Sequence, residues 1–243
     1  MEKADALQAQ LGVPVLTLRT GPDGVFGPEF RGSMELLGEV FNKSDRAAEL
    51  LDFIDGEIAA LSERTADIPE AERPGVYICG LGNWGTTSHL YTAQEYKAFD
   101  AANIRNVVTD LGKDGVQAIE EEKFVALGEE MDVLIMDAAA VKNIAPLYAE
   151  DPAMFDCCRA WREGNVYLQM AYNAYFTNYE LSLANAWFSA KSVYPERFAD
   201  IDMAAKTDEI TQAFLGAALA EEIFACPASF GGYQQIDTAA FFN

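Results

Sequence analysis

Apolar and polar positions alternate at helical spacing over residues 44–64. The apolar positions of this stretch are Ala47, Leu50, Leu51, Ile54, Ile58 and Leu61. Residues three and four apart share one helix face, and the charged residues between them occupy the other faces. Ser44 is a suitable N-cap for such a helix. We therefore expect a helix of roughly twenty residues, about 30 Å long at 1.5 Å per residue.

Beyond this stretch, short apolar runs alternate with further helical patterns. The predicted strands are residues 76–79, 106–108, 133–137 and 165–169, and an earlier apolar run predicts another at 11–18. The predicted helices are residues 92–102, 121–130, 152–162, 178–193 and 203–215. Strands separated by helices indicate an α/β fold with a doubly wound, mostly parallel sheet flanked by helices.

Capping-box patterns mark two of these helix starts. Thr92 precedes Glu95 by three residues, and Thr177 stands in the same relation to Glu180. In such a pair each side chain satisfies a free backbone group of the other residue. The pattern predicts that the two helices begin after Thr92 and after Thr177.

The stretch VYICGLGNWG places Gly80, Gly82 and Gly85 at the spacing G-x-G-x-x-G, directly after a predicted strand. A dinucleotide site requires a helix that opens on the glycines, because its N-terminus binds the pyrophosphate. Here the capping box at Thr92 delays the helix, and the bulky Trp84 stands where the backbone must approach a phosphate. We expect no nucleotide binding. The alternative is a cytosolic nucleotide- or cofactor-dependent α/β enzyme that uses this turn.

The glycine-rich loop nevertheless lies at the carboxyl end of a strand, where open α/β sheets bind ligands. Loops after Asp137 and after Gln169 share that edge. Their side chains form a predicted wall for a large planar or chelated ligand. The alternative is that the aromatic residues only pack the loops onto the sheet. The predicted ligand-binding residues are Trp84, His89, Lys142, Tyr172, Asn173 and Tyr175.

Composition narrows the function further. The chain has 17 basic and 39 acidic residues, a net charge of −22, which argues against a nucleic-acid partner. No apolar run reaches the roughly 18–20 residues that span a bilayer, and the first residues show no export signal. A single histidine excludes a zinc site of several histidines, and four cysteines without C-x-x-C spacing are expected to be free thiols. No nucleophile motif is present. We therefore expect a protein that is not an enzyme, without a cofactor or metal.

Several segments, taken in order, resemble the C-terminal half of ABC-transporter substrate-binding proteins. The class is the one with a rigid helix between its lobes, which serves iron–siderophores, haem and cobalamin. The segments are LLGEVFNKSDRAAELLDFIDGEIAALSER, RPGVYICG, NVVTDLG, IEEEKFVAL, MDVLIMDA, WREGNVYLQ and YPERFADID. The run YNAYFTNYELSLANAWFSAKSVYPERF is similar to a branch found among iron-transport binding proteins.

The resemblance implies a domain organisation and a role. Residues 1–43 are the expected remnant of an N-terminal lobe, 44–66 the interlobe helix, and 67–243 the C-terminal α/β lobe. Members of the class begin with an export signal and a whole N-terminal lobe, so this chain is expected to be truncated and the full-length protein to be extracytoplasmic. The ligand would be an iron chelate, haem or corrinoid, bound in an interlobe cleft and delivered to an ABC permease.

The same resemblance implies a docking residue. A glutamate on each lobe of these proteins docks to basic residues of the permease. The matching segment is IEEEKFVAL, in which Glu122 is the best candidate by position and Glu121 the next. The alternative is an acidic, solvated helix start that the helix dipole favours.

Overall fold

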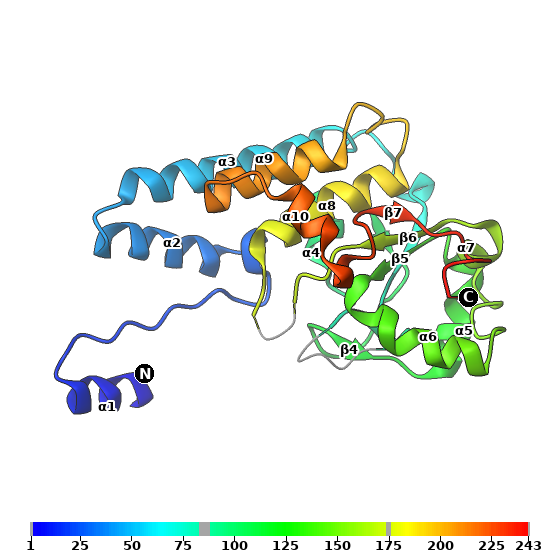
Figure 1. The fold of residues 1–243 in the computed structure, drawn as a ribbon, viewed down its shortest axis with the longest axis horizontal. Helices are drawn as coiled ribbons and strands as arrows, with labels where there is room; N and C mark the ends of the chain where they lie inside the picture. Colours follow the sequence, from blue (N-terminus) through cyan, green and yellow to red (C-terminus); the bar gives the residue numbers. More distant parts are fainter. Residues whose placement is uncertain (1, 83–87, 174–175, 243) are drawn as a thin grey trace. The chain divides into compact units, whose positions relative to one another are not determined.

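The computed structural model describes residues 2–82, 88–173 and 176–242. The chain divides into two units, Met1–Asp52 and Phe53–Asn243, and Figure 1 labels their helices and strands. The helix predicted from Ser44 is confirmed as α3 (Ser44–Glu63), which ends close to the expected residue. The boundary between the two units falls inside this helix. Within the described residues, no helix combines the length and apolar character needed to cross a membrane.

The first unit is helical. It contains α1 (Glu2–Leu11), η1 (Gly24–Phe26), α2 (Pro28–Val40) and the first part of α3. Pro28 occupies the first turn of α2, where its missing N–H is not needed. Phe30 and Ser33 of α2 are buried, and the Ser33 hydroxyl pairs with both backbone groups of Arg19 at 3.1 and 2.5 Å.

The strand predicted over residues 11–18 is wrong. Leu11 ends α1, and the residues that follow form an extended segment that pairs with no strand in the described part of the chain. Val13, Leu16 and Leu18 are exposed at 53%, 51% and 43%. These residue types favour a strand, but a strand also needs a neighbour to accept its backbone hydrogen bonds.

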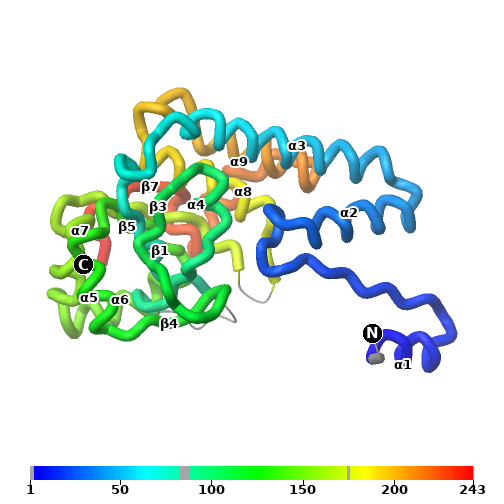
Figure 2. Tube along the Cα trace, turned by 180° about the vertical axis from the view of Figure 1, so that it is seen from behind, coloured from blue at the N-terminus to red at the C-terminus, as the bar shows by residue number. Residues whose placement is uncertain are grey.

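The second unit is built on a five-stranded sheet with the order β3-β1-β5-β6-β7. The four strands β3, β1, β5 and β6 run parallel, and β7 is antiparallel at the edge. Figure 2 labels β1, β3, β5 and β7 along the Cα trace. Their bounds are β1 (Gly75–Cys79), β3 (Arg105–Asn106), β5 (Val133–Asp137), β6 (Val166–Gln169) and β7 (Gln234–Gln235). The predicted α/β fold with a mostly parallel sheet is therefore confirmed.

Helices cover both faces of the sheet. On one face, α5 (Glu121–Leu127), α6 (Val141–Glu150) and α7 (Arg159–Glu163) share a core with alternate strand residues, including Tyr77, Cys79 and Leu168. The other face packs on α4 (Lys97–Ala101) and α8 (Tyr179–Val193), and Tyr167 meets Phe188 with ring centroids 6.3 Å apart. Behind α8 lie α9 (Met203–Leu215) and α10 (Ala220–Ala225). Short turns are η2 (Glu70–Glu72), η3 (Gly128–Glu130), η4 (Ala138–Ala140) and η5 (Pro227–Ser229).

Two predicted helices are shorter than expected. Thr92 is not a cap, because it belongs to β2 (Tyr91–Thr92), which pairs antiparallel with β4 (Gln117–Ala118), and α4 begins only at Lys97. Residues 152–157 form successive turns rather than the first part of a helix, and α7 starts at Arg159. These turns bury the Phe155 ring, which stacks on Trp161 with centroids 4.4 Å apart.

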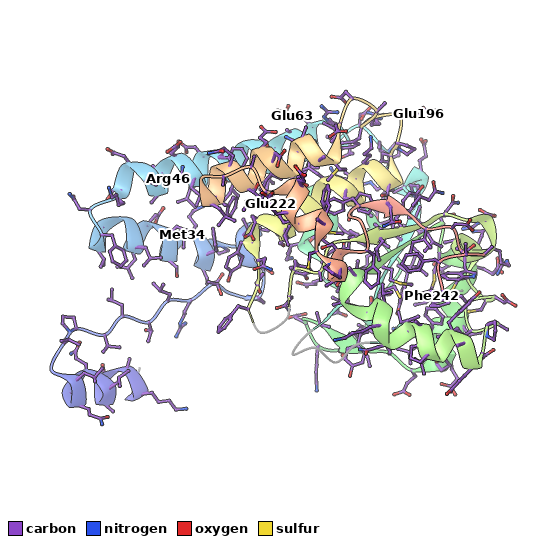
Figure 3. All side chains as sticks on the ribbon, in the orientation of Figure 1. Met34, Arg46, Glu63, Glu196, Glu222 and Phe242 are labelled. Atoms are coloured by element: carbon purple, nitrogen blue, oxygen red, sulfur yellow. The ribbon has the colours of Figure 1, made fainter. Side chains whose placement is uncertain are left out.

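The chain end closes the aromatic part of this core. Phe242 lies near Tyr148 and Trp161, with ring centroids 5.1 and 6.2 Å away (Figure 3). The residues before it thus return over α6 and α7. This contact covers the sheet face that α5, α6 and α7 share.

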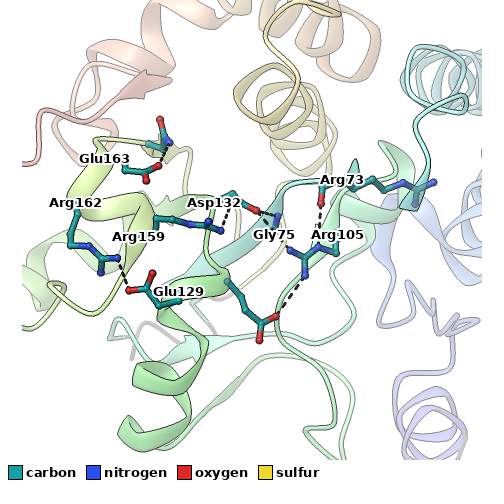
Figure 4. Close-up of polar contacts among 10 residues, drawn as sticks. Arg73, Gly75, Arg105, Glu129, Asp132, Arg159, Arg162 and Glu163 are labelled. Carbon is teal, nitrogen blue, oxygen red and sulfur yellow. Dashed lines mark hydrogen bonds and ion pairs between the residues drawn. The ribbon is translucent and has the colours of Figure 1, made fainter. Parts of the chain in front are cut away.

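Ion pairs occupy the amino edge of the sheet, where β1 and β5 begin (Figure 4). Asp132 accepts a hydrogen bond from the Gly75 amide at 2.6 Å and pairs with Arg159. Arg105 stands beside Asp132 at 3.8 Å and donates to the Arg73 carbonyl at 3.2 Å. Gly75 has no room for a side chain, because a Cβ there would overlap the Glu130 carbonyl. Ion pairs and hydrogen bonds therefore fill the amino edge of the sheet. The loops converge on the opposite, carboxyl edge.

Candidate ligand-binding site

Three loops meet at the carboxyl edge of the sheet. A Cβ on Gly82, after β1, would lie 3.1 Å from the Asn173 carbonyl oxygen, after β6, and 3.6 Å from the Ala139 Cβ, after β5. The Asn173 side chain donates to the Gly82 carbonyl at 3.1 Å. The glycine is therefore needed for close contact between loops, and Asn173 joins two of them.

Two amides at the start of the glycine-rich turn form hydrogen bonds within the protein. Gly80 has a φ of +75°, which favours glycine, and the amides of Gly80 and Leu81 both donate to the Tyr91 carbonyl at 2.8 and 3.1 Å. In the part of the chain that the structure describes, the first helix after these glycines is α4, which follows β2. This arrangement differs from a dinucleotide-binding turn, in which a helix start presents free amides to the phosphates.

The loop after β6 remains separate from α8, the helix that follows it, but the predicted cap at Thr177 is not the cause. The N-cap of α8 is Asn178 rather than Thr177, and the Asn178 amide donates to the Tyr172 carbonyl at 2.7 Å. The Thr177 hydroxyl instead donates to the Asn173 side-chain oxygen at 3.4 Å, and the two residues form an antiparallel bridge. The capping-box prediction is wrong at Thr177 because its side chain takes this partner within the loop.

A buried carboxyl lies directly beneath the edge. Asp137, the last residue of β5, is 1% exposed. One of its oxygens accepts from the Ala139 amide at 2.9 Å, and the other accepts from the Gln169 Nε2 at 3.1 Å. Burial raises the pKa of the Asp137 carboxyl to about 7, although both hydrogen bonds act in the opposite direction.

Gln169 continues the polar contacts toward two tyrosines. The Tyr96 hydroxyl lies 3.3 Å from the Gln169 Oε1 and 3.1 Å from its Nε2. The Tyr172 ring is 6.4 Å from the Tyr96 ring, centroid to centroid. Burial raises the pKa of the Tyr172 hydroxyl, the charge of Asp137 adds to that rise, and the Tyr96 hydroxyl partly offsets it as a hydrogen-bond partner.

The orientation of Tyr172 decides what it offers to a ligand. The residue is partly exposed, while its hydroxyl is buried on the side of Tyr96 and Asp137. A raised pKa opposes the phenolate form that coordinates iron. Tyr172 therefore presents an aromatic ring at the edge, and its hydroxyl interacts with Tyr96 and Asp137 inside the protein.

His89 lies elsewhere. The residue is 6% exposed, and its imidazole packs edge-on against Phe124 and Phe155, with centroids 5.0 and 5.6 Å away. Its Nε2 is 3.3 Å from a Glu121 carboxylate oxygen, and burial lowers its pKa against the pull of that carboxylate. These partners belong to the α5 face of the sheet, whereas Tyr96 and Tyr172 belong to the face of α4 and α8. The structure does not bring His89 together with Tyr172 and Asn173.

The remaining predicted residues have different positions. Lys142 is exposed as the second residue of α6, just after the loop that follows β5. Trp84 and Tyr175 lie outside the described residues. Phe176, which is not among the predicted binding residues, is 87% exposed in the loop after β6. The sequence signal for Phe176 was the aromatic run YNAYF on a loop at this edge. An apolar ring that is exposed on such a loop does not contribute to packing.

The two candidate docking residues open α5. Glu120 is the N-cap, and Glu121 and Glu122 are the first two helical residues. The Glu121 side chain is 53% exposed and pairs with His89. Glu122 is exposed, and the described residues give it no ion pair.

The chain is similar in sequence to known proteins over most of its length. Residues 2–168 match a family model described as periplasmic binding protein. The molybdate-binding protein MolA of Haemophilus influenzae is 24% identical over 200 residues, which are 80% of this chain and 54% of MolA. The chain thus spans about half the length of this relative.

Solved structures of similar proteins share the fold. A solute-binding protein of an ABC transporter from Sulfurospirillum deleyianum superposes with a TM-score of 0.65 at 21% identity, covering 92% of this chain and 67% of that one. A periplasmic heme-binding protein from Pseudomonas aeruginosa gives 0.56 at 19% identity, covering 78% and 67%. Since the family model matches well over half of the chain, and the sheet and its flanking helices agree with it, the protein belongs to the periplasmic binding protein family.

Proposed function

We propose that this chain is the larger part of the solute-binding component of an ABC importer. The solute is an iron chelate, haem or a corrinoid, held at the carboxyl edge of the sheet and passed to an ABC permease outside the cytoplasm. In this proposal, residues 44–66 are the interlobe helix and 67–243 the C-terminal lobe. The observation that carries it is the exposed Phe176 ring, which shares with the partly exposed Tyr172 a loop at the edge where β1, β5 and β6 end.

The chemistry of the edge favours a large, partly apolar chelate over a small oxyanion. Aromatic rings cover apolar, planar surfaces of a ligand, whereas a compact oxyanion needs several converging donors. Lys142 is the one cationic side chain in the sequence of the three loops, residues 80–87, 138–142 and 170–178. Molybdate, the ligand named for the relative, is therefore the competing solute to test.

Membership of a family of binding proteins agrees with the prediction that the chain is not an enzyme. The enzyme alternative depended on the glycine-rich turn. The amides of Gly80 and Leu81 are already paired with the Tyr91 carbonyl, so these two amides are not free to bind a phosphate.

Direct binding measurements test the proposal. The chain is titrated with hemin, a ferric tris-catecholate, cobalamin and molybdate, with quenching of intrinsic fluorescence as the readout. We expect one of the three large ligands to bind and molybdate not to displace it. Phe176→Ala removes an aromatic contact of about 1.5–3 kcal/mol, so affinity should fall roughly tenfold or more.

Phe41→Ala is the matched control, since Phe41 is 67% exposed in the first unit, outside the loops of this edge. It should leave the affinity unchanged. Binding of molybdate alone, or equal losses in both variants, contradicts the proposed ligand class.

A further inference from the structure

We propose that Asp137 couples solute binding at the sheet edge to the uptake of one proton, and that it acts on Tyr172 through Gln169 and Tyr96. The inference rests on the proposed function, since it concerns the same edge. Asp137 is a positioning residue here, because Tyr172 and not the carboxyl faces the solute.

The register of β5 and β6 brings the side chains of Asp137 and Gln169 into contact. Asp137 and Gln169 are the final residues of β5 and β6, and they are partners in the parallel ladder. Partners in a ladder project their side chains to the same face of the sheet. The Gln169 Nε2 thus meets the carboxylate at 3.1 Å and lies at the same distance from the Tyr96 hydroxyl. The steps from the carboxylate to Gln169 and from Gln169 to Tyr96 are each one hydrogen bond, and the Tyr172 ring lies 6.4 Å from the Tyr96 ring, centroid to centroid.

Among the described residues, the groups that interact with Asp137 come from several elements, and none of them is a cation. On the face of the sheet that holds Asp137 they are Tyr96 before α4, Gln169 of β6, Tyr172 of the loop after β6 and Tyr233 before β7, and Cys79 of β1 interacts with the carboxyl from the opposite face. Glu180 of α8 faces Tyr233 and adds negative charge. A carboxylate without a cationic partner is disfavoured in such surroundings, and burial raises the pKa of Asp137 to about 7.

The charge of Asp137 fixes the direction of the hydrogen bonds. An ionised carboxylate only accepts, so it holds the Gln169 amide nitrogen and leaves Oε1 to accept from the Tyr96 hydroxyl. Tyr96 can then accept from Tyr172, whose proton points inward. A neutral carboxyl donates, the amide turns over, and Nε2 donates to Tyr96, whose proton then points to Tyr172. The Tyr172 O–H bond stays intact and turns away from Tyr96, and the single proton added, at Asp137, comes from solvent.

Solute binding favours the neutral form. A ligand that covers the Tyr172 ring excludes water from the edge, and exclusion of water disfavours a buried charge further. The bound protein therefore takes up a proton at Asp137, and affinity falls as the pH rises through the neutral range. One additional pKa unit on binding corresponds to an affinity change of about tenfold.

The ligand-free chain gives the first test. The side-chain Cζ resonances of Tyr96 and Tyr172, assigned with Tyr96→Phe and Tyr172→Phe, are followed by NMR from pH 5 to 9. We expect both to move with a common midpoint near neutrality and to be static in Asp137→Asn. Asp114→Asn, at an exposed carboxyl that meets Gln94 at 3.2 Å, should leave the midpoint unchanged. Static tyrosine resonances in the unsubstituted chain, or identical titration in Asp137→Asn, overturn the inference.

The second test uses hemin as the probe. Its affinity is measured at pH 6 and pH 8, and Asp137→Asn reports any pH effect of hemin itself. We expect the ratio of the two affinities to be about tenfold larger in the unsubstituted chain than in the variant. Equal ratios overturn the coupling. Absence of hemin binding excludes haem as the solute, and the resonance titration then decides whether Asp137 acts on Tyr172.

Discussion

Lys206 of α9 donates to Glu57 of α3 at 3.2 Å, although the two residues are 149 positions apart in the chain. Both side chains are nearly buried, at 12% and 11% exposure. The Lys206 ammonium also lies 4.4 Å above the Trp187 ring of α8 and pairs with Glu209. This contact joins the second half of α3 to the two helices that back the sheet.

The pair predicts a large effect of removing one partner. Lys206→Met should lower the free energy of unfolding by about 3 kcal/mol, because it leaves the Glu57 carboxylate buried without its cation. The double variant Lys206→Met with Glu57→Gln should recover part of the loss. Urea unfolding of the three proteins measures both values.

An exposed ion pair is the control for this prediction. Arg46 and Glu49 meet at 3.0 Å on the first part of α3, with 44% and 71% of their side chains exposed. Arg46→Met should change stability by less than about 0.5 kcal/mol. A loss for Lys206→Met as small as this one would contradict the role assigned to the buried pair.

Two glycines in different surroundings should respond oppositely to alanine. At Gly56 of α3 a Cβ meets nothing within 4 Å, so Gly56→Ala should stabilise the protein by about 0.5–1 kcal/mol through helix propensity. At Gly128 a Cβ would overlap the Cys157 backbone carbonyl, so Gly128→Ala should destabilise it by about 1–3 kcal/mol. Thermal unfolding of the two variants measures the difference, and shifts of the same sign would be inconsistent with these contacts.

Elements with local signals were predictable from the sequence. The helix over residues 203–215 has the predicted bounds because Asp202 caps it, accepting from the Ala205 amide at 2.8 Å, and Gly216 ends it at a φ of +78°. The strand over residues 133–137 was equally clear as an isolated apolar run. Both signals lie within a few residues of the element they define.

Features that depend on distant partners were not predictable. Thr92 has the spacing of a capping box, but it belongs to a strand that pairs with residues 117–118, far along the chain. Thr177 has the same spacing, and its competing partner, Asn173, is local, since it lies in the same loop. The polar contacts of Asp137 likewise join three segments far apart in sequence, ending at Tyr96 and Gln169. His89 looked like an edge residue because its backbone follows the glycine loop. The fold turns it to the other face, where the Tyr77 hydroxyl donates to its carbonyl at 2.8 Å.

The buried Asp137 predicts how stability depends on pH. Its pKa is about 7 in the folded chain against 3.8 as the ordinary value. Between these values the folded state holds a proton that the unfolded state has lost, so the free energy of unfolding falls as the pH rises from about 4 to 7. A pKa difference of about three between the folded and unfolded states corresponds to at most roughly 4 kcal/mol in the free energy of unfolding.

Comparison with Asp137→Asn isolates this contribution. His89 acts in the opposite direction, because its lowered pKa makes the folded state gain stability as the pH rises toward 6.5. Subtracting the urea-unfolding free energies of the two proteins at each pH cancels the histidine. A difference that stays constant between pH 4.5 and 7.5 would show that the carboxyl does not titrate in this range.

The extended segment of the first unit predicts self-association. Leu11, Val13, Leu16 and Leu18 are all more than 40% exposed, and contiguous exposed apolar residues favour association. Replacing Val13 and Leu16 together by lysine should reduce both the binding of an apolar dye and the apparent mass at high concentration. Light scattering measures the mass. A strictly monomeric parent chain without dye binding would contradict this prediction.

The opening turn of α5 predicts where a permease docks. We expect Glu122 to contribute most, because it is exposed and makes no ion pair among the described residues, whereas Glu121 is partly engaged by His89 at 3.3 Å. Glu122→Lys should weaken binding to the permease in nanodiscs about tenfold, since a lost charge pair at an interface removes about 1.4 kcal/mol or more. Glu121→Lys should weaken it less and also lower stability, because the imidazole loses its partner. Glu222→Lys is the matched control, at an acidic opening turn of α10 (Figure 3). If Glu222→Lys weakens binding as much as Glu122→Lys, net charge alone sets the affinity, and α5 is not the docking surface.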